Sequence, residues 1–241
     1  MTAVAPSIFT PNEAGFFTRY LARIQLREKL MGGTPKNPKL IEGWLRSKAG
    51  VTADEEVRMM MVRTLIELGA ELDPGETDMA KITAASEAMA GVKQTNGFKR
   101  NGTSLYIEGR QVKAMLKESI NALFAGEEKW GKTKKGPKNF AAEHVFIADE
   151  RISLGTEEPS GVEFVIGHLT GPGGPRATVG YVEYVYQPIL GFTVLCDPVA
   201  EGQVTDDHWR RIWLHAQENG LGAMRSQGHG RFNVIEWTRL S

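Results

Sequence analysis

A glycine-rich stretch at residues 220–232 constrains the fold of this chain more than any other feature. It places four glycines between an expected helix over 206–219 and an expected strand over 231–238. Glycine allows positive φ and a close approach of the backbone to a partner. With Arg225 and Arg231 within it, the loop suits a polyanion whose sugar-phosphate chain runs along the protein backbone. A simple turn that ends a helix and restarts a strand explains the glycines equally well.

The direction of the chain through this loop excludes two common phosphate-binding motifs. No Gly-Lys-Ser or Gly-Lys-Thr closes it, so it is not a Walker loop. A dinucleotide-binding fingerprint leads from strand to helix, whereas this loop leads from helix to strand. We therefore expect a loop with exposed backbone N–H groups, in which arginines contact phosphate and the other polar side chains contact sugar or base edges. Its expected contact residues are Gly222, Arg225, Ser226, Gln227, His229 and Arg231.

Composition limits the classes of protein to which the chain can belong. The formal net charge is zero over 241 residues, so any polyanion site must be a local patch. The single cysteine, Cys196, excludes an internal disulfide and a cysteine zinc site, and the five histidines lack the spacing of a metal-binding helix. We expect neither a metal nor a cofactor. No stretch reaches the roughly 20 apolar residues of a membrane span, and residues 1–10 lack the basic region and the long apolar core of a secretory signal, so we expect a cytoplasmic protein.

Hydrophobic periodicity predicts an α+β fold. Alternation over 16–30 indicates a strand, with Tyr20 and Ile24 on one side and Arg19, Arg23 and Arg27 largely on the other. Helical spacing is found over 39–48, 53–72, 78–91, 110–124 and 206–219. Residues 93–102 are expected to form a loop. Further strands are expected over 104–108, 144–148, 161–168, 178–186 and 189–196.

Basic residues gather at three further places. The helix over 110–124 carries Arg110, Lys113 and Lys117 on the face opposite its apolar stripe. Residues 169–177 form the expected tip of a long hairpin and include Arg176. The loop over 129–138 is rich in lysine and glycine. This last loop is also explained as a solvated surface segment.

Two segments resemble the RAMP superfamily of CRISPR-associated proteins. Residues 106–117, Tyr-Ile-Glu-Gly-Arg-Gln-Val-Lys-Ala-Met-Leu-Lys, are similar to its strand-to-helix motif, although Glu108 stands where proline is usual and Ala114 where a second glycine is usual. Residues 220–232 are similar to its glycine-rich loop. Residues 24–26 followed by 32–35 resemble the start of a backbone subunit, in which a loop after the first strand meets RNA; Lys36 lies in that loop. The segment 31–38 contains no aspartate, the residue that carries target cleavage in RNA-cleaving relatives.

The resemblance implies a ferredoxin-like or RRM-like βαββαβ core, in agreement with the periodicity. It implies a single domain over 1–241, with a helical insertion over 50–102 and a thumb-like β-hairpin insertion over 160–190. Arg176 at the hairpin tip would contact phosphate or stack on a base. The partners would be a single-stranded guide RNA, neighbouring copies of the chain and other subunits of an effector complex.

Three functions fit these observations. The first is a non-catalytic RNA-binding subunit that oligomerises along single-stranded RNA in a CRISPR-type ribonucleoprotein. The second is a metal-independent endoribonuclease in which His229 is the general base and Arg225 or Arg231 stabilises the phosphorane. The third is a scaffold subunit whose glycine loop packs on a protein partner without nucleic acid. The residues fit RNA and single-stranded DNA alike.

Overall fold

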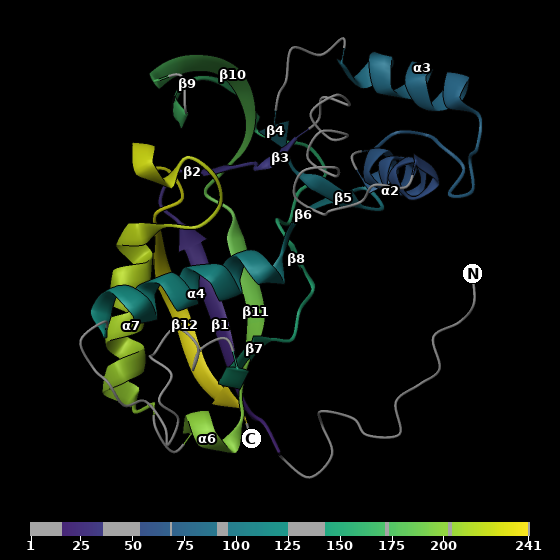
Figure 1. Cartoon of the computed structure of the whole chain (residues 1–241). Coiled ribbons are helices and arrows are strands. Elements are labelled where there is room, and N and C mark those ends of the chain that lie inside the picture. Colours follow the sequence, from purple (N-terminus) through teal and green to yellow (C-terminus); the bar gives the residue numbers. More distant parts are fainter. Residues whose placement is uncertain are drawn as a thin grey trace.

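A four-stranded antiparallel sheet forms the centre of the molecule, in the order β12 (Phe232–Leu240), β1 (Thr18–Leu26), β11 (Ile189–Cys196), β7 (Val145–Ile147). The computed structural model describes residues 16–35, 54–67, 69–90, 96–124, 143–171, 174–201 and 204–240. Helix α4 (Gly109–Leu123) connects β1 to β7, and helix α7 (Asp206–Asn219) connects β11 to β12. Both helices cover the same face of the sheet (Figure 1). This βαββαβ order is the ferredoxin-like arrangement, and it confirms the α+β prediction.

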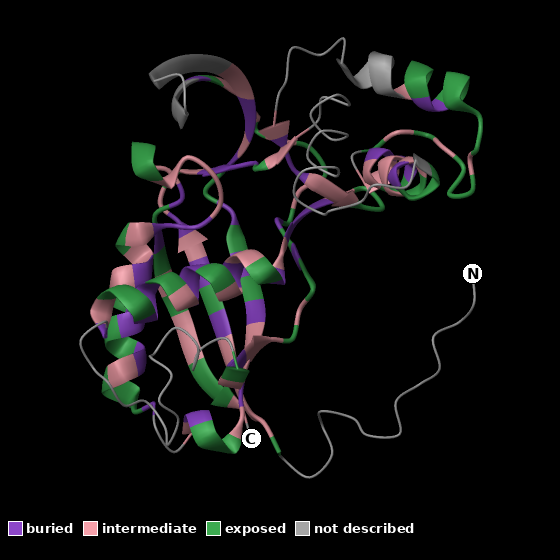
Figure 2. Ribbon diagram, viewed as in Figure 1, coloured by how far each residue is buried: buried purple, intermediate pink, exposed green. Residues whose placement is uncertain are grey.

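Alternation along β1 explains why one face of the sheet is covered. Tyr20, Ala22, Ile24 and Leu26 are buried, while the residues between them are more exposed (Figure 2). Because successive strand residues point to opposite faces, the buried set meets the helices and the arginine-bearing set meets solvent. A β-bulge shifts the β1–β12 register between Arg23 and Ile24.

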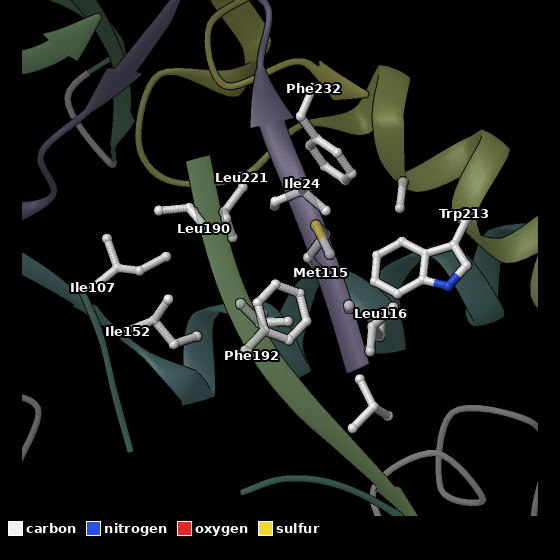
Figure 3. Close-up of a cluster of buried hydrophobic side chains, with 14 of the residues drawn as sticks. Ile24, Ile107, Met115, Leu116, Ile152, Leu190, Phe192, Trp213, Leu221 and Phe232 are labelled. Atoms are coloured by element: carbon white, nitrogen blue, oxygen red, sulfur yellow. The ribbon is translucent and has the colours of Figure 1, made fainter. Parts of the chain in front are cut away.

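The two helices bury apolar stripes against this sheet. In α4 the buried stripe includes Val112, Met115, Leu116 and Ile120, as the helical spacing predicts. In α7 it consists of Trp209, Ile212, Trp213 and Ala216. Figure 3 shows side chains from both helices and the sheet meeting in one cluster. Leu221 of the glycine loop also belongs to this core and is 1% exposed.

Two long segments interrupt the core topology. Between β1 and α4 lie β2 (Lys29–Met31), β3 (Thr34–Pro35), α2 (Asp54–Glu67), α3 (Met79–Ala90), β4 (Asn96–Gly97), β5 (Lys99–Asn101) and β6 (Ser104–Glu108). Between β7 and β11 lie β8 (Arg151–Ser153) and the hairpin of β9 (Gly161–Gly171) and β10 (Gly174–Tyr186), which curves beyond one end of the core sheet (Figure 1). A short helix, α6 (Pro198–Glu201), follows β11. The single-domain division, with insertions at 50–102 and 160–190, stays a prediction.

Several sequence-based boundaries are wrong. The strand expected over 16–30 ends at Leu26, and a new strand begins at Lys29 because β2 pairs with β10 rather than with the core sheet. The loop expected over 93–102 contains β4 and β5, and β8 was missed. These strands are two or three residues long, too short for a periodic signal. Helix α2 ends at Glu67, and the segments 39–48 and 129–138 lie outside the described residues.

No helix within the described ranges is long and apolar enough to cross a membrane.

Candidate nucleic-acid interface

The glycine loop folds back on itself between α7 and β12. Gly220 ends α7 with φ +80°, and its N–H donates to the carbonyl of Ala216 at 2.9 Å. The N–H of Leu221 then donates to the carbonyl of Gly230 at 2.9 Å, which closes the loop. Gly230 has φ +78°, and a Cβ there would overlap the carbonyl oxygen of Leu221. Only glycine fits these positions, because of both the positive φ and the close backbone contact.

The inner side of the loop packs on the insertions. A Cβ at Gly222, where φ is +85°, would lie 2.8 Å from Leu30 Cδ1 of β2. The N–H of Ala223 donates to the carbonyl of Met31 at 3.2 Å. Ala223 and Met224 also pack against a small apolar cluster that joins β2 to the hairpin, made of Met31, Val165 and Val182. The loop is therefore held rigidly between the core and the base of the β9–β10 hairpin.

Six of the loop's backbone amides are already hydrogen-bonded within the protein. Carbonyl oxygens of the chain accept from the N–H groups of Gly220, Leu221, Ala223, Gln227, Gly228 and Gly230. The expectation of an exposed row of amides is therefore wrong for these residues, because a tightly folded loop satisfies its own buried polar groups. Its solvent side is a short 3-10 helix over Arg225–Gln227, followed by exposed Gly228.

Both loop arginines are ion-paired with glutamates of the helices. Arg225 donates from its two terminal nitrogens to Glu118 of α4, with Nη2 at 3.2 Å from Oε1 and Nη1 at 2.5 Å from Oε2. Hydrogen bonding from Arg225 lowers the pKa of Glu118 below its ordinary value. Arg231, whose side chain is 53% exposed, has its Nε 3.8 Å from Glu218 Oε2 at the end of α7. All these side chains are accessible enough for the pairs to exchange partners.

The structure adds Arg27 and Lys29 to this surface. The N–H of Arg27 donates to the carbonyl of Arg231 at 2.9 Å, and its guanidinium lies 2.7 Å from Glu218. The carbonyl of Lys29 accepts from the N–H of Gly230 at 3.0 Å, and its ammonium lies 2.9 Å from Glu163. The sequence analysis did not predict Arg27 or Lys29 as contact residues. The arginines at alternate positions of the first strand could have drawn attention to Arg27. However, no pattern in the neighbouring sequence shows that this strand lies beside residue 231.

Arg110 and Lys113 of α4 lie away from the loop, whereas Lys117 precedes Glu118, the residue of α4 that contacts Arg225. Arg110 donates to Glu108 at 2.6 Å and lines a cleft of about 500 Å³ between α2, β6 and β8. Lys113 lies 4.4 Å above the ring of Phe146 in β7, the opposite edge of the sheet from β12. Burial and then the nearby charge of Lys117 lower the pKa of Lys113. The helix therefore does not bring Arg110 and Lys113 together with the loop arginines.

The remaining sequence-based candidates have no place in a described site. His229 is partly buried, and within the described part of the chain no side chain forms a hydrogen bond or ion pair with its ring. Arg176 pairs through its backbone with Leu169 in the hairpin, but its side chain lies outside the described residues, as does all of Lys36. Among the side chains that are described, no group of three or more His, Cys, Asp or Glu could hold a metal ion.

No protein-family model matches the chain, and no curated protein matches it. Solved structures similar to it include the type III-B Cmr-beta complex bound to cognate target RNA, with 13% identity, a TM-score of 0.41 and coverage of 93% of this chain and 61% of the other. Cmr6 from Pyrococcus furiosus is also similar, at 12% identity and a TM-score of 0.32, covering 90% and 98%. The Cas6 (TTHA0078) product complex has 15% identity and a TM-score of 0.22, covering 90% and 100%. The three are CRISPR-associated RAMP-type proteins, and at these identities and TM-scores they assign neither an activity nor a ligand to this chain.

Proposed function

We propose that this chain is a non-catalytic subunit that binds single-stranded RNA through the glycine loop and the cations around it. The observation that supports this most directly is the gathering of Arg27, Arg225 and Arg231 around one rigid loop at the end of α7. Guanidinium groups bind phosphate through paired N–H donors, and a rigid loop loses little entropy on binding. Lys29, fixed by the same loop, extends the patch toward the β9–β10 hairpin.

The same proposal places the chain in a CRISPR-type ribonucleoprotein, where copies assemble along a guide RNA with other effector subunits. The ferredoxin-like core and the resemblance of residues 106–117 and 220–232 to RAMP motifs support it. The patch contacts phosphate rather than base edges, which suits a subunit that follows RNA of any sequence. Protein purified from cells should therefore carry RNA of regular length, detected by absorbance and by sequencing of the bound fraction.

Salt dependence of RNA binding tests the proposed interface. We expect affinity for a single-stranded RNA to fall steeply with salt, with a log-log slope of about −0.7 for each phosphate contact. Arg225→Ala and Arg231→Ala should each weaken binding to all sequences alike and make the slope shallower by about 0.7. Arg239→Ala is the control, because this exposed arginine pairs with Glu201 at the far end of β12. Affinity that does not change with salt would contradict the proposal.

A cleavage assay tests the non-catalytic part of the proposal. Labelled RNA incubated with the pure protein in EDTA should remain intact, since His229 has no orienting partner within the described residues. Cleavage that His229→Ala abolishes would instead establish the endoribonuclease.

A further inference from the structure

Glu118 of α4 reaches across to the glycine loop and holds the arginine that we assign to phosphate. Its two carboxylate oxygens accept from the two terminal nitrogens of Arg225. Asn219, at the end of α7, donates from its side-chain amide to Glu118 Oε2 at 3.2 Å. Glu118 and Arg225 remain 47% and 32% exposed, so solvent and ligands reach the pair. The guanidinium thus presents to the carboxylate the same paired donors that it would offer to a phosphate.

The pairing repeats on the other side of the loop. Glu218 of α7 lies 2.7 Å from Arg27 and 3.8 Å from Arg231. Each guanidinium that we assign to phosphate therefore faces a carboxylate from one of the two core helices. A phosphate cannot use these donors in full until the carboxylate moves away. Since both partners are partly exposed, the pairs are weak enough for such an exchange.

We propose that Glu118 is a specificity-determining residue, a resident carboxylate that a backbone phosphate of RNA must displace from Arg225. The inference rests on the proposed function. An isolated phosphate would gain one contact and lose the Arg225–Glu118 pair, which leaves little net affinity. A strand of linked phosphates displaces several carboxylates after a single association step, because its second and later contacts form within the complex. Glu118 thus makes the loop selective for a polyanion over small phosphates.

Glu118→Gln tests this because it removes the charge and keeps the size of the side chain. We expect its affinity for a short single-stranded RNA to rise about two- to fivefold, the range for loss of a competing surface ion pair. A purely structural role for Glu118 predicts a loss of affinity instead. Glu118→Ala should give a gain of the same direction, which excludes an effect of the introduced amide.

Two controls separate competition from a general change in charge. Glu71→Gln removes the same charge from an exposed position between α2 and α3, on the other side of the structure from the loop, and should leave affinity unchanged (Figure 1). In an Arg225→Ala background Glu118→Gln should give no gain, because the competed donor is absent.

The outcomes distinguish this inference from the proposed function. If the unaltered protein binds RNA and Glu118→Gln binds equally or more weakly, the inference is wrong and the proposed function stands. A gain that persists without Arg225 also overturns it. If none of the proteins binds RNA, the proposed function is wrong and the inference fails with it. Denaturation curves of each variant confirm that affinity is compared between folded proteins.

Discussion

Gly230→Ala should destabilise the protein far more than Gly228→Ala, although both glycines lie in the same loop at positive φ. Gly230 has φ +78° and Gly228 has φ +88°. An alanine in this region costs about 1–2 kcal/mol at either position. At Gly228 a Cβ would have no atom within 4 Å, so that backbone cost is the whole effect.

At Gly230 the added Cβ would overlap the carbonyl oxygen of Leu221, and the backbone must move. The movement would break or lengthen two hydrogen bonds, from the N–H of Leu221 to Gly230 at 2.9 Å and from the N–H of Gly230 to Lys29 at 3.0 Å. Each such bond contributes about 1 kcal/mol. The expected loss of unfolding free energy is therefore about 3–4 kcal/mol, which exceeds that of Gly228→Ala by about 2 kcal/mol.

Urea denaturation followed by tryptophan fluorescence measures this difference, since Trp209 and Trp213 lie in the same core cluster as Leu221 of the loop. A difference of this size also separates the melting temperatures of the two variants by roughly 4–8 °C for a chain of this length. Equal losses of stability would refute the reasoning, because they would mean that Gly230 does not hold the loop closed.

Three further predictions concern the helix cap, the thiol and the loop ion pair. Thr205→Ala should lower the unfolding free energy by about 1 kcal/mol, because the Thr205 hydroxyl accepts from the N–H of His208 at the start of α7. Urea denaturation measures this loss of stability. An unchanged denaturation midpoint would show that the hydroxyl does not stabilise the helix as a cap. Burial raises the pKa of Cys196 to about 12, so a thiol reagent should modify it only after unfolding; rapid labelling of the native protein would be evidence against this burial. Arg225 lowers the pKa of Glu118, so the pair stabilises the fold above the ordinary pKa of 4.5 and this stabilisation is lost as pH falls through the lowered pKa. Unfolding curves at several acidic pH values should therefore show a smaller decline in the unfolding free energy for Arg225→Ala than for the unaltered protein. Identical declines in the two proteins would argue against the pair.

The core helices and strands could be predicted because each is specified by residues close together in the sequence. Helix α7 matches its predicted range 206–219, since the apolar spacing that predicts a helix acts within a few residues. The strand β11 and the limits of β6 follow from alternation in the same way. Short strands such as β4 and β8 were missed because they exist only by pairing with distant strands.

By itself the sequence determined most of the core helices and strands and a glycine-rich connection between the last helix and strand, and its resemblance to RAMP motifs implied their βαββαβ order. Tertiary structure alone decided what that connection presents to solvent. It paired six of the loop's amides with carbonyl oxygens of the chain, brought Arg27 beside Arg231, and placed Glu118 on Arg225 across 107 positions of the chain. No local pattern encodes such a pair, because the two residues meet only when α4 and α7 pack on the same face of the sheet. The arrangement of charged side chains at the candidate interface is therefore decided by how the helices pack on the sheet.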